Sequence, residues 1–123
     1  MMTAKDNVIK IKSFAFAVRI VKLSQYLQTE KKEFVLSKQL LRSGTSVGAM
    51  VYEAEQAQSK ADFVHKLSVA QKEINETMYW IELLRATEFL ATEQFESMNH
   101  DAVELIKIIT SIIKTSKSNN LRG

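Results

Sequence analysis

Four basic side chains near the start of the chain are spaced as a phosphate-binding row would be. Lys5, Lys12 and Arg19 recur every seven residues, which places them about 10 Å apart on one helix face, and Lys22 flanks the row. Residues 1–32 hold seven Lys or Arg against two Asp or Glu, an excess larger than the net charge of +3 of the whole chain. Such a row could follow the phosphates of RNA or DNA, and the alternative is a solvated helix face without a ligand.

Two pairs of acidic and histidine residues come nearest to a catalytic or metal-binding motif. They are Asp62 with His65 and Glu96 with His100. Di-metal sites in helical bundles use repeated Glu-x-x-His motifs together with carboxylates from the other helices, and neither pair recurs. The chain has no cysteine, so a thiolate metal site is also excluded. The sequence therefore predicts a protein that is not an enzyme, with no catalytic residue, no metal and no cofactor.

Two of the three glycines, Gly44 and Gly48, lie within a segment that otherwise has the pattern of a helix. A glycine inside a helix costs about 1 kcal/mol relative to alanine, so the pair requires a reason. A phosphate-binding loop needs a strand before the glycines and a lysine after them, and both are missing. A turn is excluded because the apolar spacing continues through Gly44 to Val51. We therefore expect a helix face that a neighbour approaches closely, with Ser43 and Ser46 beside the glycines.

Four long helices are predicted to carry these residues. The chain has 123 residues, enough for one domain, with no proline and 46% hydrophobic residues. Apolar residues recur at steps of three and four in four segments, roughly 5–29, 37–57, 60–90 and 93–115. The tail, 116–123, lacks this spacing and is expected to fray. Because four apolar stripes of similar length can close around one core, the predicted fold is all-α: a single domain, 1–123, forming an antiparallel up-and-down four-helix bundle.

The same spacing predicts which residues face the core and where the helices begin. Ser37, Ser59 and Thr92 are candidate caps of the second, third and fourth helices, with Asp62 completing a capping box at Ser59. The predicted core stripes are Ile11, Phe14, Val18 and Val21 in the first segment; Leu40, Gly44, Val47, Val51 and Ala54 in the second; Phe63, Leu67, Ala70, Ile74, Thr77, Ile81 and Leu84 in the third; and Phe95, Met98, Ala102, Leu105, Ile109 and Ile112 in the fourth.

Three residues outside these stripes point to contacts between helices or subunits. Arg42 and Glu53 lie eleven residues apart, near three helical turns, so they share a face. Pairing with a neighbouring helix or subunit fits them better than catalysis, and Arg42 joins the candidate phosphate contacts if its side chain is exposed. Trp80 lies off the main stripe of its helix with Tyr79 and Leu83. A subunit interface would use such surface, although a wide core could also absorb it.

Three stretches carry a resemblance to known proteins: QLLRSGTSVGAMVYEA at 39–54, QSKADF at 58–63 and INETMYWIELL at 74–84. With them, nearly the whole chain resembles the bacterial four-helix-bundle proteins, also called the 23S rRNA-intervening sequence proteins. The Arg-Ser-x-x-Ser-[Ile/Val] core is the most specific part of the pattern. The chain departs from the family at Met50, where Asn is common. The residues that match the family pattern are Arg42, Ser43, Ser46, Val47, Glu53 and Ser59.

The resemblance implies a fold and a set of partners rather than a reaction. Related proteins are homopentamers, and the accessory proteins of diversity-generating retroelements resemble the same bundle and pair with a reverse transcriptase and nucleic acid. No enzymatic activity is attached to the family. From the resemblance we expect a homo-oligomer of five copies that meets RNA or DNA, and a protein partner such as a reverse transcriptase.

The cytoplasm is the location expected from the sequence. The apolar run SFAFAV at 13–18 is shorter than an export signal, and no stretch approaches the roughly 18 apolar residues of a membrane span. Two functions remain open. One is a nucleic-acid-binding oligomer whose affinity falls steeply with salt, and the other is a protein-binding or structural assembly module whose basic face is only solvated.

Overall fold

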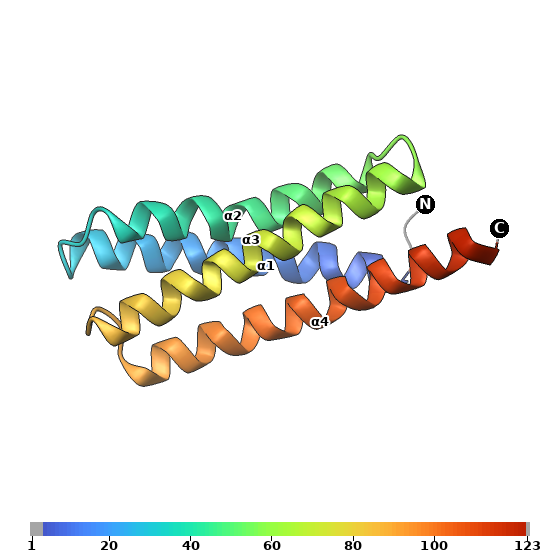
Figure 1. Ribbon diagram of the computed structural model, residues 1–123. Helices are drawn as coiled ribbons and strands as arrows, with labels where there is room; N and C mark the ends of the chain where they lie inside the picture. Colours follow the sequence, from blue (N-terminus) through green and yellow to red (C-terminus); the bar gives the residue numbers. More distant parts are fainter. Residues whose placement is uncertain (1–3, 123) are drawn as a thin grey trace.

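In the computed structural model the chain forms four helices and no strand across the part that the structure describes, residues 4–122, with side chains described from 6 to 118. The helices are α1 (Ala4–Thr29), α2 (Leu36–Glu55), α3 (Lys60–Ala86) and α4 (Thr92–Arg122). Successive helices run in opposite directions, so α1 begins and α4 ends at the same end of the bundle (Figure 1). The predicted all-α, up-and-down four-helix bundle is confirmed.

The order of the helices around the bundle follows their order along the chain. Each helix packs against the next, and α4 packs against α1. Within the described residues α1 has no close backbone contact with α3, and α2 has none with α4, so these are the two diagonal pairs. A residue that points outward from α1 therefore lies on the opposite side of the bundle from one that points outward from α3.

The core takes one apolar stripe from each of α2, α3 and α4, as the spacing predicts. On these three helices every predicted stripe residue is buried except Phe63 and Phe95, which are partly buried and pack against the core. Gly44 and Thr77 are buried within the stripes of α2 and α3. Steps of three and four residues identify the inner face correctly wherever a helix has a single apolar face.

The predicted inner face of α1 is wrong. Ile11 and Phe14 are 70% and 72% exposed, and Val18 and Val21 are also exposed. The core instead receives the opposite face of the helix, made by Ile9, Phe16, Ile20 and Leu27. The physical reason is that α1 is apolar on both faces, so its spacing alone could not show which face turns inward. A helix of this kind is normally one that is covered on both sides.

The start of α2 is held by Glu33 rather than by the predicted cap, Ser37. The Glu33 carboxylate accepts hydrogen bonds from the backbone N–H groups of Val35, Leu36 and Ser37, at 3.2, 3.0 and 2.7 Å. Ser37 is fully buried, and its hydroxyl donates back to the Glu33 carbonyl at 2.8 Å. A carboxylate suits this place because it satisfies free N–H groups and lies at the positive end of the helix dipole. Helix α2 accordingly begins at Leu36, one residue before the predicted start at 37. It ends at Glu55, two residues before the predicted end at 57.

The turns after α1 and α3 use left-handed residues that are not glycine. Lys32 has a φ of 54° and Glu88 a φ of 68°. After α3, the N–H groups of Phe89 and Leu90 both donate to the Leu84 carbonyl, which closes the helix end. Helix α3 therefore stops at Ala86, four residues before the predicted end. The sequence did not show this end, because no glycine marks the left-handed position.

Helix α4 differs from its predicted bounds at both ends. Thr92 is its first helical residue rather than its cap, and the Gln94 side chain accepts from the Ala91 N–H at 2.8 Å. The helix continues to Arg122, whereas the sequence predicts fraying from residue 116. Ile112 and Ile113 are buried and anchor the last turns, and extending a formed helix needs little further stabilisation.

The Ser59 cap of α3 is confirmed, since its side chain accepts from the Asp62 N–H at 3.1 Å.

Candidate interaction surfaces

The two glycines of α2 admit α1 at close range. A Cβ on Gly44 would lie 2.6 to 2.8 Å from three side-chain atoms of Ile20, which is fully buried. A Cβ on Gly48 would lie 3.3 Å from the backbone carbonyl oxygen of Ser13. Gly44 thus receives a core side chain, and Gly48 receives the backbone of the neighbouring helix. Both belong to the contact between α1 and α2.

The outward side of α1 carries a row of exposed apolar residues. We call this row the α1 apolar face; it spans residues 8 to 21, a length of about 20 Å along the helix. Its members are Val8, Ile11, Phe14, Val18 and Val21.

A groove of about 890 Å³ runs between this face and α2. Small residues, Ala17, Gly48 and Ala49, and the large side chains of Phe14 and Tyr52 line it. Asn7 and Lys10 add polar groups to the lining, and Lys10 also pairs with Glu55 at 2.8 Å. The groove adjoins the α1 apolar face, and Ile11 and Phe14 belong to both.

The predicted phosphate-binding row on α1 is tied mainly to α4. Lys12 forms an ion pair with Glu104 at 3.2 Å. Arg19 pairs with Asp101 and also donates to the Ser97 hydroxyl at 2.8 Å. Lys22 is exposed and has no ion pair within residues 6–118, and the Lys5 side chain lies outside the described residues. Lys12 and Arg19 therefore join α1 to α4, which the sequence could not show because their partners lie on the last helix of the chain. Phosphate binding by the row stays a prediction.

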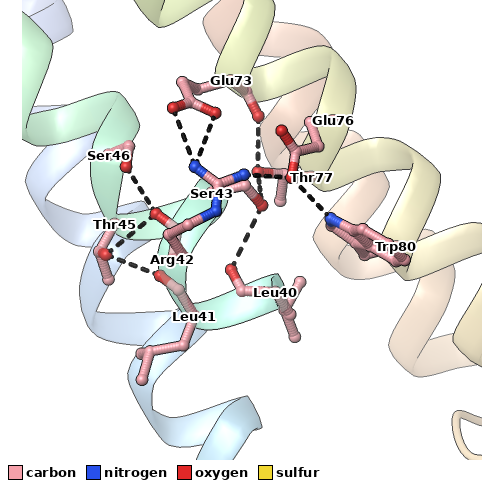
Figure 2. A network of polar contacts seen from close by, with 10 residues as sticks. All are labelled: Leu40, Leu41, Arg42, Ser43, Thr45, Ser46, Glu73, Glu76, Thr77 and Trp80. Atoms are coloured by element: carbon pink, nitrogen blue, oxygen red, sulfur yellow. Dashed lines mark hydrogen bonds and ion pairs between the residues drawn. The ribbon is translucent and has the colours of Figure 1, made fainter. Parts of the chain in front are cut away.

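Arg42, the fifth candidate phosphate contact, is held by two carboxylates of α3. Figure 2 shows its guanidinium group directed at Glu73 and Glu76. The Glu76 carboxylate also accepts from the indole N–H of Trp80 at 3.0 Å. The hydrogen bond from Arg42, followed by that from Trp80, lowers the pKa of Glu76, and the hydrogen bond to Glu76 raises the pKa of Arg42. Arg42 therefore joins α2 to α3, as one of the alternatives from the sequence has it.

Of the two serines beside the glycines, Ser43 serves the same contact between α2 and α3, and Ser46 bonds within its own helix. Ser43 is fully buried, and its hydroxyl is hydrogen-bonded to that of Thr77 at 2.9 Å (Figure 2). Ser46 donates to the carbonyl of Arg42, one turn earlier in its own helix, at 2.6 Å. Glu53 pairs with Lys66 of α3 at 3.0 Å. The segment around the glycines thus packs against α1 on one side, through Gly44 and Gly48, and bonds to α3 on the other.

The aromatic pair on α3 is divided between the core and the surface. Trp80 is partly buried and packs against the core. Tyr79 is 60% exposed and meets the Trp80 ring edge-on, with ring centroids 5.0 Å apart. Within the described residues, Tyr79 is the one exposed large apolar residue on α3 or α4.

The sequence reasoning missed a second basic surface, on the last half of α4. Lys107, Lys114 and Lys117 are exposed and form no ion pair within residues 6–118. No Asp or Glu follows Glu104 in the sequence. The sequence does contain this run of cations without acids after residue 104. A charge count over residues 91–123 hides it, because four acids at 93–104 balance the four later cations.

Metal sites and membrane spans are two further classes of feature that a helical protein can carry. No three or more His, Asp or Glu side chains among the described residues come together in a way that could hold a metal ion. None of the helices, as far as they are described, is long and apolar enough to cross a membrane.

A family model and a solved structure both relate the chain to one family of proteins. Residues 5–111 match the model of the 23S rRNA-intervening sequence protein family. The chain is 62% identical to a protein of unknown function from the S23 ribosomal protein family of Bacteroides thetaiotaomicron VPI-5482, whose crystal structure superposes with a TM-score of 0.89. The match covers 89% of this chain and 98% of that one. No curated protein matches the chain.

Proposed function

The chain belongs to the 23S rRNA-intervening sequence protein family, and we propose that it is a non-enzymatic assembly protein that self-associates through the α1 apolar face. One observation carries the proposal: α1 is apolar on both sides, and its outer side, with Ile11 and Phe14 about 70% exposed, is uncovered in the single chain. Scattered exposed apolar residues need no explanation, but a continuous row beside an apolar groove is typical of a protein interface.

A second copy of the chain is the partner that the proposal names. The homopentamers that the sequence resembles lead us to expect five copies. The same resemblance extends the proposal to a protein partner such as a reverse transcriptase. The proposed cytoplasmic location rests instead on the shortness of the apolar run at 13–18.

Replacement of Phe14 tests this proposal. Phe14→Asp places a charge at the centre of the α1 apolar face. We expect the mass of this variant in light scattering to be that of one chain, whereas the wild-type protein has the mass of an oligomer. Val35→Asp is the matched control, because Val35 is 71% exposed but lies outside the face, and it keeps the wild-type mass. Circular dichroism verifies that both variants remain helical. An unchanged mass for Phe14→Asp would refute the assignment of this face.

Nucleic-acid binding is a second candidate function, favoured by the unpaired lysines of α4. We propose that Lys107, Lys114 and Lys117, rather than Lys12 and Arg19 of α1, which are already paired, supply the phosphate contacts. Each phosphate contact that a lysine makes contributes about one unit to the slope of log affinity against log salt.

The experiment is a salt titration with a short double-stranded RNA and the DNA of the same sequence. Replacing the three α4 lysines with Gln should weaken binding and flatten the slope by about three units. Lys12→Gln with Arg19→Gln is the control, because both cations are already paired. If the wild-type protein binds neither nucleic acid at low salt, this second function is wrong and assembly alone remains.

A further inference from the structure

We infer that the outward surface of α3 and α4 binds a single-stranded nucleic acid, with a base stacked on Tyr79 and the neighbouring phosphates held by lysines. This site rests on the second candidate function, nucleic-acid binding, and specifies the class of strand and two further residues, Lys72 and Tyr79 of α3. Four lysines of these helices are exposed and form no ion pair within residues 6–118. We call them the α3–α4 basic surface: Lys72, Lys107, Lys114 and Lys117.

Two contacts fix the register of α3 against α4. The Gln71 side chain donates to the Thr110 hydroxyl at 2.7 Å, and the Arg85 guanidinium lies 4.9 Å from the centre of the Phe95 ring. The two helices run in opposite directions, so residues at one level along the bundle have numbers that add up to about 180.

This register places Tyr79 at one end of the α3–α4 basic surface. Lys72 and Tyr79 are seven residues apart, so they share the outward face of α3 about 10 Å from each other. Lys107 of α4 lies between the levels of these two residues, and Lys114 and Lys117 lie further toward the end of the chain. From Tyr79 to the level of Lys117 the surface is about 22 Å long, the length of about six nucleotides of a stacked strand.

The acids of α3 beside this surface are turned toward α2. Glu73 and Glu76 share Arg42 of α2. The Asp62 carboxylate, near the start of α3, accepts from the backbone N–H of Gln58 at 3.4 Å. Lys72 therefore faces outward without an acid opposite it on its own helix.

The acids of α4 beside this surface are turned toward α1. Asp101 pairs with Arg19, and Glu104 pairs with Lys12. No Asp or Glu follows Glu104 in the sequence. The charge of the α3–α4 basic surface is thus not neutralised within the described residues, and a row of phosphates is its complement.

Tyr79 offers an aromatic ring beside these cations. Its side chain is 60% exposed, and its ring meets Trp80 edge-on with centroids 5.0 Å apart. The indole N–H of Trp80 donates to Glu76 at 3.0 Å, so the ring behind Tyr79 is held in place (Figure 2). Glu82, the next acid along α3, pairs with Arg85. A base stacks on an exposed aromatic ring of this kind while cations hold its phosphates.

The other exposed aromatic residues among the described side chains lack such cations. Phe14 and Tyr52 line the apolar groove, where Lys10 is already paired. Phe34 follows residues 30–33, in which two glutamates balance two lysines. Tyr79 is therefore the ring on which we expect a base to stack.

Stacking on Tyr79 requires a strand whose bases are free. In a duplex the bases stack on each other and pair, so a ring on the outside of a helix reaches only the last base pair. A single strand exposes the face of each base, and every base has such a face, so stacking depends little on sequence. The lysines alone would hold the phosphates of either form.

Binding of labelled oligonucleotides, measured by fluorescence anisotropy at several salt concentrations, tests the inference. The probes are oligo(dT) and oligo(rU) of eight nucleotides, an abasic strand of the same length and a hairpin duplex. Tyr79→Leu should weaken binding of both single strands at least about fivefold, and should leave binding of the abasic strand and the duplex unchanged. Tyr79→Phe keeps the ring and should bind as the wild type does. Circular dichroism verifies that the variants remain helical.

Matched controls separate these contacts from general effects of charge and exposed rings. Phe34→Leu removes an exposed ring elsewhere and should bind as the wild type does. Lys72→Gln should lower the slope of log affinity against log salt by about 0.7 for the single strands. Lys38→Gln removes an exposed lysine near the start of α2, at the other end of the bundle from Lys117, and should leave the slope unchanged.

The fluorescence of Trp80 gives a second readout that needs no variant. Trp80 is the single tryptophan of the chain and touches the Tyr79 ring. A base stacked on Tyr79 should quench this emission, whereas the abasic strand should not. Unchanged emission at saturation with oligo(dT) would place the bases elsewhere and overturn the inference.

Each other outcome overturns a specific statement. If the wild-type protein binds nucleic acids but Tyr79→Leu binds the single strands equally well, nucleic-acid binding stands and the stacking site is wrong. If Lys72→Gln leaves the slope unchanged, the phosphates do not reach α3. A wild-type protein that binds none of the probes at low salt contradicts nucleic-acid binding itself.

Discussion

The contact between Gly44 and Ile20 gives a prediction whose sign depends on the neighbour. Alanine in place of a helical glycine stabilises a helix by about 1 kcal/mol. At Gly44 the new Cβ would lie 2.6, 2.7 and 2.8 Å from Cγ1, Cγ2 and Cδ1 of Ile20, and the buried side chain cannot move into solvent. Overpacking of this kind costs about 1–3 kcal/mol, so Gly44→Ala should lower the free energy of unfolding by about 1 kcal/mol net.

The same substitution should become stabilising when Ile20 is replaced by alanine. Ile20→Ala alone removes the three atoms that would clash and should cost about 2–5 kcal/mol through the cavity that it leaves. Gly44→Ala in that background retains its gain in helix propensity and partly fills the cavity, so it should raise the free energy of unfolding by about 1 kcal/mol. The coupling energy between the two positions is then about 2 kcal/mol, within the range seen for residues in contact.

Urea unfolding followed by circular dichroism measures this cycle, with all variants at one protein concentration because assembly would shift the midpoint. Gly48→Ala is the matched control. Its Cβ would meet the Ser13 backbone and not the Ile20 side chain, so its effect should be the same in the wild-type and the Ile20→Ala backgrounds. An equal effect of Gly44→Ala in both backgrounds would refute the packing role assigned to Gly44.

Three further predictions concern the helix ends and the contact between α2 and α3. Lys32→Gly and Glu88→Gly should each raise the free energy of unfolding by about 1 kcal/mol in thermal unfolding, because both residues have positive φ; a loss of stability would contradict the turn geometry. Glu33→Ala should lower it by about 1 kcal/mol, since three N–H groups lose their acceptor, and an unchanged midpoint in urea would contradict this. Because Arg42 lowers the pKa of Glu76, the ionised carboxylate stabilises the folded chain above the ordinary carboxyl pKa, and this stability is lost as pH falls through the lower folded-state value. The free energy of unfolding of Glu76→Gln should therefore depend less on acid pH than that of the wild type. An equal dependence in urea titrations at several pH values would count against the Arg42–Glu76 pair.

The fold could be predicted wherever each helix has one apolar face. On α2, α3 and α4 one apolar stripe continues along the helix, and steps of three and four identify the core from Leu40 to Ile112. On α1 the pattern is ambiguous, because Ile9, Phe16 and Ile20 form one stripe and Ile11, Phe14 and Val18 form another. A pattern with two apolar faces does predict that both will be covered, and the missing cover is the basis of the proposed assembly.

The helix ends and the ion pairs were less accessible to sequence reasoning. Lys32 and Glu88 adopt a conformation that glycine usually marks, so no signal placed the end of α3 at Ala86. Arg19 and Asp101 form a pair across 82 positions, and only the packing of α1 on α4 brings them together. The role of Arg42 could not be predicted for the same reason, because its partners Glu73 and Glu76 come within reach only through the packing of α2 on α3.

The mass of the wild-type protein in solution, measured by light scattering over a range of concentrations, tests the central claim most directly. A self-associating protein with an uncovered α1 apolar face should have a multiple of the chain mass of 14.0 kDa, and five copies give about 70 kDa. A mass of 14.0 kDa at every concentration would contradict the account, because the α1 apolar face would then remain open to water.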